Sequence, residues 1–153
     1  MRTCAAPKSA WLLDDGGVSD APLGPEDYDS VLDAGRILHE RGWIKAYTLN
    51  EQVDGWQHIV ESVEEGYALT IDDYTNDLYV RGWLDQVRSL VTRPVRLSLD
   101  DRLAALDARF MHATTAPRRH MPGAGSEWWY RVPKVLVGDL REDVERLRLI
   151  EAE

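Results

Sequence analysis

Residues 99–113 read LDDRLAALDARFMHA, and this stretch carries the clearest structural signal in the chain. Its apolar residues recur at spacings of four, three, four and three, which places them on one face of an α-helix. The residues of this face are Leu99, Leu103, Leu106, Phe110 and Ala113. Residues 98–101 read SLDD, which has the spacing of a helix cap. We therefore predict a helix that opens near residue 98 and a fold whose core is supplied mostly by helices.

Four more helices are predicted on either side of this one. The first opens at Pro25, because proline suits a first helical position and two acids follow it. The second is capped by Asn50 and ends at Gly66. The third opens with a capping box at residues 70–73 and runs to about Val91. The last follows a possible capping box at residues 139–142.

Strand signals are short and few. We expect strands near residues 44–49, 67–71 and 128–136, the last at a sheet edge because it contains Pro133. Residues 114–126 are expected to form a loop. The predicted fold class is α+β and predominantly helical, with about five helices and a small two- or three-stranded sheet. The residues expected to be buried are Trp43, Trp56, Leu78, Leu84, Leu103, Leu106 and Phe110.

The length of 153 residues suits one domain with a proper hydrophobic core. We predict a weakly ordered segment at residues 1–24 and a single globular domain at residues 25–153. The one cysteine, Cys4, cannot form an intrachain disulfide, which fits a reducing compartment. No apolar run approaches the roughly 20 residues of a membrane span, and the N-terminus lacks a secretory signal. A cytoplasmic location without membrane contact is expected.

The formal charge of −9 is unevenly distributed along the sequence. Residues 1–80 hold 16 acids and 5 bases, whereas residues 81–153 hold 11 acids and 13 bases. An acidic chain is repelled by phosphate backbones, so nucleic acid is an unlikely partner. Negative charge attracts basic proteins and speeds their association. The charge distribution therefore favours a basic protein partner.

The densest acidic motif is DDYTND at residues 72–77, which has three interpretations. Its carboxylates suit Mg²⁺ or Ca²⁺, although the spacing is not that of a calcium loop. Acids are also common at helix starts, where they cap free amides. The third interpretation is an exposed surface for a basic partner. We favour the third over the metal and predict Asp72, Asp73 and Asp77 as partner-binding residues.

The sequence EWWYR at residues 127–131 is the second candidate binding segment. In a regular strand, adjacent aromatics face opposite sides, so one side is core and the other is either packed or exposed. Trp, Tyr and Arg dominate binding hot spots, so Trp128, Trp129 and Arg131 are predicted partner-binding residues. Burial of both faces is the plainer alternative. Nucleic-acid binding with the help of residues 118–120 (RRH) ranks third.

Signals for catalysis are weak. The chain has no Gly-x-Ser-x-Gly elbow, no phosphate loop and no pair of histidines with zinc spacing. We predict no catalytic residue, no metal and no cofactor. The leading hypothesis is a small acidic non-enzymatic binding protein, such as an immunity or inhibitor protein that neutralises a basic toxin or nuclease. The alternative is a small enzyme with a composite site built from the acids of residues 72–77 and a histidine.

Overall fold

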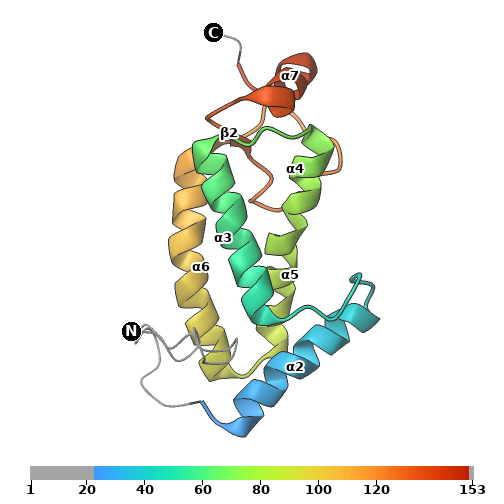
Figure 1. Cartoon of the computed structure of the whole chain (residues 1–153), viewed down its shortest axis with the longest axis vertical. Coiled ribbons are helices and arrows are strands. Elements are labelled where there is room, and N and C mark those ends of the chain that lie inside the picture. Colours follow the sequence, from blue (N-terminus) through green and yellow to red (C-terminus); the bar gives the residue numbers. More distant parts are fainter. Residues whose placement is uncertain (1–22, 152–153) are drawn as a thin grey trace. The chain divides into compact units, whose positions relative to one another are not determined.

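The computed structural model describes residues 23–151. Most of the segment predicted to be weakly ordered, together with Cys4, lies outside these residues. The chain divides into two compact units. The described part of unit 1 comprises residues 23–55 and 82–105, and that of unit 2 comprises residues 56–81 and 106–151. The division falls within three helices, so each unit takes residues from both halves of the sequence (Figure 1).

The helices confirm the predicted fold class. They are α2 (Pro25–Glu40), α3 (Leu49–Glu65), α4 (Ile71–Asp77), α5 (Tyr79–Val87), α6 (Arg93–Ala113) and α7 (Gly138–Leu147), with a 3₁₀ turn η1 (Arg88–Leu90). A single residue, Leu78, separates α4 from α5. The amide of Arg81 bonds to the Leu78 carbonyl three residues earlier, so the backbone is tightened there. The predicted helix over residues 71–91 is thus two helices and a 3₁₀ turn.

Unit 1 is built from α2, η1 and the adjoining parts of α3, α5 and α6. Asp27, which is buried, accepts a hydrogen bond from the Gly24 amide at 2.8 Å and another from the Thr92 hydroxyl at 2.6 Å. Gly35 lies so close to the carbonyl of Tyr47 that a β-carbon would collide with it. This close approach explains the glycine in the middle of α2.

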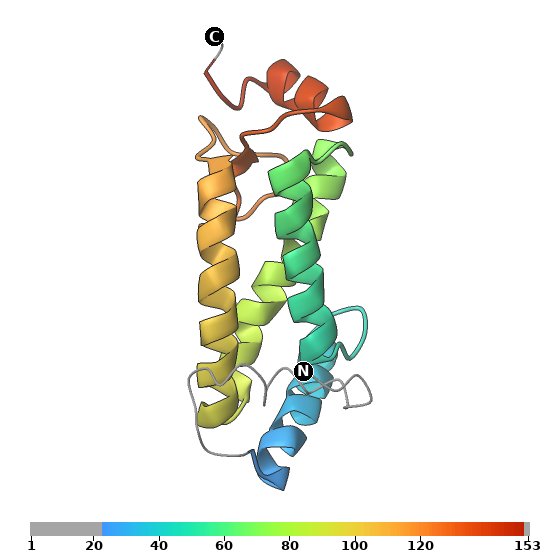
Figure 2. The ribbon, with the colours of Figure 1, turned by 60° about the vertical axis from the view of Figure 1, so that its left-hand side comes forward.

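Unit 2 holds the only sheet among the described residues. Strand β1 (Thr114–Thr115) pairs antiparallel with β2 (Val132–Pro133), and Figure 2 shows this ladder at the end of α6. The third predicted strand is therefore confirmed only at its centre. Its partner lies in a segment that we predicted as a loop. Residues 67–71 form a single parallel bridge, Tyr67 to Leu136, rather than a strand.

The predicted strand at residues 44–49 is wrong. Residues 41–48 form a loop, and the Tyr47 ring packs edge-on against Trp83 at 6.2 Å between centroids. The cap of α3 also differs from the prediction. Thr48 and Glu51 form a reciprocal capping pair, with amide-to-side-chain distances of 2.8 and 3.2 Å. Asn50 is the second residue of α3 and is buried there instead of capping the helix.

Two other helix starts move for local reasons. Helix α6 begins at Arg93, five residues before the predicted cap, because Pro94 is tolerated in a first helical turn. Helix α7 begins at Gly138 after Val137, which makes no side-chain cap. The predicted capping box at residues 139–142 is therefore wrong. Of the seven residues expected in the core, six are buried and Trp43 is only half-buried.

Candidate functional site

Two of the three predicted partner-binding acids in α4 have structural roles. Thr70 caps the helix, and Asp73 completes the capping box by accepting the Thr70 amide and hydroxyl. Asp77 accepts the Tyr67 hydroxyl at 2.6 Å. Asp72 is exposed, and its carboxylate has no hydrogen-bond or ion-pair partner among the described residues. The cap interpretation therefore accounts for Asp73, and only Asp72 presents an unengaged carboxylate.

Two tyrosines fix α4 within unit 2. Burial, followed by the neighbouring Asp77 carboxylate, raises the pKa of the Tyr67 phenol well above its usual value. The buried Tyr74 hydroxyl donates to the carbonyl of Arg131 at 2.5 Å, and burial likewise raises the pKa of that phenol. The two rings meet edge to face with centroids 5.1 Å apart. Both phenols therefore stay neutral and act as hydrogen-bond donors.

The structure brings a second group of acids to the start of α4, and sequence reasoning missed it. Asp143 of α7 accepts the amide of Ile71, the first residue of α4, at 2.9 Å. This backbone hydrogen bond, followed by the bond from Arg146, lowers the pKa of the Asp143 carboxyl. The amide of Asp139 bonds to the Ala68 carbonyl at 2.9 Å, just before α4. The first turns of α4 and α7 therefore lie together.

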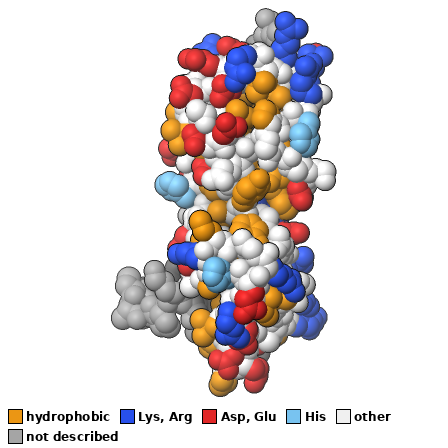
Figure 3. All heavy atoms as spheres, turned by 90° about the vertical axis from the view of Figure 1, so that its right-hand side faces the viewer, with side chains coloured by type: hydrophobic (Ala, Val, Ile, Leu, Met, Phe, Trp, Pro, Cys, Tyr) orange, Lys and Arg blue, Asp and Glu red, His pale blue; other side chains and the backbone are white. Residues whose placement is uncertain are grey.

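We call this surface the α4–α7 acidic end, and it consists of Asp72, Asp73, Asp139, Glu142 and Asp143. Acidic side chains gather in the upper part of the face drawn in Figure 3, with arginines beside them. Within the α4–α7 acidic end, Arg146 pairs with Asp143 at 2.9 Å. The side chains of Asp72, Asp139 and Glu142 are without a hydrogen-bond or ion-pair partner among the described residues, and all three residues are exposed. In the sequence, the α7 part of this surface was indicated only by the two acids within residues 139–142. These acids lie in the second half of the sequence, where bases outnumber acids.

The aromatic segment is a turn rather than a strand. Residues 127–129 curve back, with the amide of Tyr130 on the Glu127 carbonyl at 3.3 Å. Trp129 is buried at 4% exposure, whereas Trp128 is 41% exposed. The two indoles meet edge to face at 5.8 Å. The turn therefore has one buried and one exposed tryptophan, but the strand from which opposite-facing aromatics were predicted is not formed at these residues.

Arg131 does not point to the surface as a free cation. It is half-buried, and its Nε donates to the Thr114 hydroxyl at 2.8 Å while Nη2 donates to the Thr114 carbonyl at 3.1 Å. The Thr114 hydroxyl in turn donates to the Phe110 carbonyl at 2.8 Å. Arg131 therefore ties the aromatic turn to β1.

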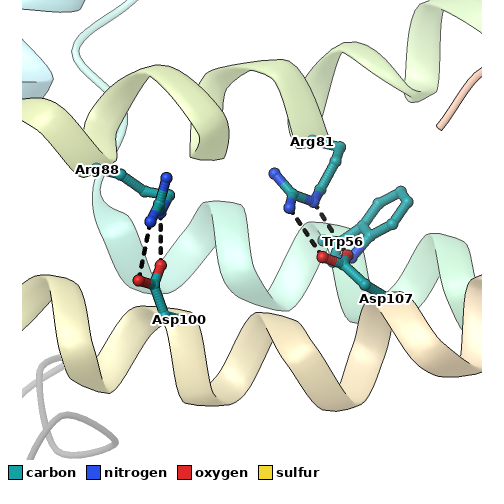
Figure 4. A network of polar contacts seen from close by, with 5 residues as sticks. All are labelled: Trp56, Arg81, Arg88, Asp100 and Asp107. Carbon is teal, nitrogen blue, oxygen red and sulfur yellow. Dashed lines mark hydrogen bonds and ion pairs between the residues drawn. The ribbon is translucent and has the colours of Figure 1, made fainter. Parts of the chain in front are cut away.

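A buried ion pair lies behind the aromatic turn. Arg81 donates two hydrogen bonds to Asp107, from Nε to Oδ1 at 3.0 Å and from Nη2 to Oδ2 at 2.8 Å. Trp56 donates its indole N–H to the same Oδ1 at 3.0 Å (Figure 4). The guanidinium carbon lies 5.5 Å from the Trp128 ring centre and 5.3 Å from that of Trp129. Arg81 is thus held between a carboxylate and two indoles.

Sequence reasoning did not single out Arg81, Asp107 or Trp56 as one cluster. The signal in the sequence was limited to charged residues on otherwise apolar helix faces. Such residues are rarely buried unless they are paired. The pairing itself joins residues 26 positions apart, which periodicity alone does not reveal.

The histidines do not assemble with the carboxylates into a metal site. Within residues 23–151, no three His, Cys, Asp or Glu side chains are placed to hold a metal ion. His58, His112 and His120 are exposed, and His39 shares a hydrogen bond with the Trp43 carbonyl at 2.7 Å. The described residues therefore offer the metal-dependent form of the composite enzyme hypothesis no assembled metal site.

Comparison with protein-family models, curated proteins and solved structures finds no match to this chain. No helix among the described residues is long and apolar enough to cross a membrane.

Proposed function

We propose that this chain is a non-enzymatic binding protein that engages a basic protein partner through the α4–α7 acidic end. The proposal extends to an inhibitor or immunity role, in which the acidic surface covers the basic active surface of a toxin or nuclease. The single observation that carries it is the meeting of three partnerless carboxylates, Asp72, Asp139 and Glu142, on two packed helices.

Charge arrangement supports this surface over the rest of the chain's acids. Most other acids in unit 2 are engaged, as Glu64 is by Arg109 at 2.7 Å and Asp107 is by Arg81 at 2.8 Å. Exposed, unpaired carboxylates keep their full charge for a partner and steer its approach. Their backbone is also fixed, since the Ile71 and Asp139 amides tie the two helix starts together. A fixed backbone lowers the entropy lost when a partner binds.

Charge reversal tests the proposal. A triple variant, Asp72→Lys with Asp139→Lys and Glu142→Lys, is compared with the wild type in affinity capture from host lysate. A matched control reverses Asp29, Glu40 and Asp54 of unit 1, which are also exposed and partnerless among the described residues. We expect a basic protein captured by the wild type and the control but lost from the triple variant. The rate at which the captured basic protein associates with the wild-type chain should fall steeply as the salt concentration is raised.

The inhibitor role requires one further result. The captured protein should lose its enzymatic or toxic activity when the wild-type chain is added and keep it when the triple variant is added. Equal capture by all three proteins, or capture without a salt dependence, would contradict binding through the acidic end. Capture that leaves the partner's activity unchanged would contradict the inhibitor role alone.

A further inference from the structure

Unit 2 contains two buried hydrogen-bond donors that no group within residues 23–151 satisfies. Arg81 uses Nε and Nη2 on Asp107, but its Nη1 is buried without a partner. Figure 4 shows this third nitrogen pointing away from Asp107. The Trp129 indole N–H is likewise buried and unbonded. Buried donors without acceptors are rare in proteins, because each loses its hydrogen bonds to water without replacement.

The two donors belong to groups in contact. The Arg81 guanidinium carbon lies 5.3 Å from the centre of the Trp129 ring. The Tyr130 ring lies beside Trp129 with ring centroids 6.1 Å apart, and burial raises the pKa of its phenol. The Trp129 N–H makes no hydrogen bond to it. The Asp107 oxygens already accept three bonds, from Arg81 and Trp56.

The groups around these two donors indicate what kind of ligand could bind there. Arginine and indole N–H groups can only donate, so the group that satisfies them must accept. A carboxylate accepts at up to four lone-pair sites and donates nothing. The two indole rings stand at 82° to each other, so a planar group can lie flat against one of them. Hydrogen bonds from Arg to a carboxylate are also among the strongest in proteins, because both groups are charged.

Trp128 is placed to control access to these donors. Its ring covers one face of the Arg81 guanidinium at 5.5 Å, yet the residue is 41% exposed. It meets Phe110 and Trp129 only through edge contacts, at 6.2 and 5.8 Å between centroids. No hydrogen bond to another described residue holds its side chain. Rotation of this one indole toward solvent would uncover the guanidinium while Asp107 keeps it in place.

We propose that Arg81 and Trp129 form a binding site for a carboxylate group, with Trp128 as its movable cover. The carboxylate bridges Arg81 Nη1 and Trp129 Nε1, and its organic substituent lies against the indole rings. This site is separate from the α4–α7 acidic end and does not depend on the function proposed for that surface.

The indole N–H resonances of the full chain give a direct test. Tryptophan-to-phenylalanine variants assign the Trp129, Trp128 and Trp56 signals. Benzoate is the probe, and benzamide is its matched control because its amide replaces one accepting oxygen with an NH₂ group that donates. We expect a saturable shift of the Trp129 indole proton with benzoate and about tenfold weaker binding of benzamide, the loss that one unfavourable hydrogen bond produces.

Variants separate this site from nonspecific binding. Trp129→Phe removes the N–H and keeps an aromatic ring, so benzoate binding followed at the Trp128 indole should weaken about tenfold. Arg88→Lys alters the other Arg–Asp pair and should leave binding unchanged. Absence of a saturable shift at Trp129 would overturn the proposal. Equal binding of benzoate and benzamide, or full binding by Trp129→Phe, would overturn it as well.

Discussion

Two arginine–aspartate pairs join the same stretches of chain but lie in different environments. Arg81 and Arg88 are seven residues apart, as are their partners Asp107 and Asp100. Both arginines use Nε and Nη2 to hold both oxygens of the partner carboxylate (Figure 4). The side chains of the Arg81 pair, in unit 2, are 8% and 21% exposed, whereas those of the Arg88 pair, in unit 1, are 40% and 37% exposed.

The difference lies in the surroundings rather than in the contact. Two tryptophans flank Arg81, and a third donates to Asp107, so water is largely excluded. The Arg88 pair remains half in solvent, where charge attraction is screened. The two pairs therefore share one hydrogen-bond pattern, but we expect them to contribute very different amounts to the free energy of unfolding. The difference in surroundings also explains why only the Arg81 side leaves a nitrogen buried and unpaired.

The largest expected effect is that of Arg81→Ala. Removal of the guanidinium leaves Asp107 without its ion-pair partner and Trp129 without its cation–π contact. A buried charge that loses its partner is costly. We expect unfolding free energy to fall by about 3 kcal/mol, measured by urea denaturation. A loss below about 1 kcal/mol would show that the Arg81 pair is no more valuable than an exposed one.

Trp128→Ala makes the Arg81 pair more like the Arg88 pair, because it removes one covering ring. The variant loses a partly desolvated cation–π contact and an edge contact with Phe110. We expect a loss of about 1 kcal/mol in unfolding free energy. Met111→Ala, which truncates another exposed large apolar side chain of unit 2, is the control for general loss of surface area. An unchanged stability in Trp128→Ala would mean that the ring does not shield the pair.

Arg88→Ala should cost at most about 1 kcal/mol, since both partners are half-exposed. The cost should shrink further in 1 M salt, where the screening length falls to about 3 Å. Urea denaturation at low and high salt measures both values. The comparison of the two pairs fails if Arg88→Ala is as destabilising as Arg81→Ala, or if its effect does not respond to salt.

The smallest effect concerns a third, exposed pair, Glu64 with Arg109, and depends on pH. The hydrogen bond from Arg109 lowers the pKa of the Glu64 carboxyl in the folded chain. Its contribution is therefore fully present above the unfolded-state pKa of about 4.3 and is lost as pH falls through the lower folded value. We expect Glu64→Gln to melt slightly below the wild type at pH 6, with the gap closing under acid conditions. A gap that widens as pH falls would reverse the assigned direction.

Helix faces were predictable because they depend on local periodicity. The spacing from Leu99 to Phe110 places the core face of α6, and Gly66, with φ of +128°, ends α3 as its sequence position predicts. Strand positions were not predictable to the same degree. A ladder of two residues leaves almost no periodic signal, and the partner of Val132 lies in a segment with loop composition.

The candidate site was half predictable. Residues 72–77 and 127–131 were both singled out, and Asp72 and Trp128 present exposed side chains, while Asp73, Asp77 and Arg131 are engaged internally. The charge asymmetry between sequence halves does not survive folding. The described residues of unit 1 hold ten acids and seven bases, and those of unit 2 hold 13 and nine, because each unit draws on both halves.

The sequence by itself determined the helical class, the core faces of the helices and the capping box at Thr70, because each depends on residues within a few positions of one another. Only the tertiary structure decided which charges are neutralised and which remain. Arg81 meets Asp107, and Asp143 meets the start of α4, across 26 and 72 positions of chain. Neighbours distant in sequence determine how far a charged side chain is buried. That burial, rather than the residue type, decides whether the side chain stabilises the fold or is available for binding.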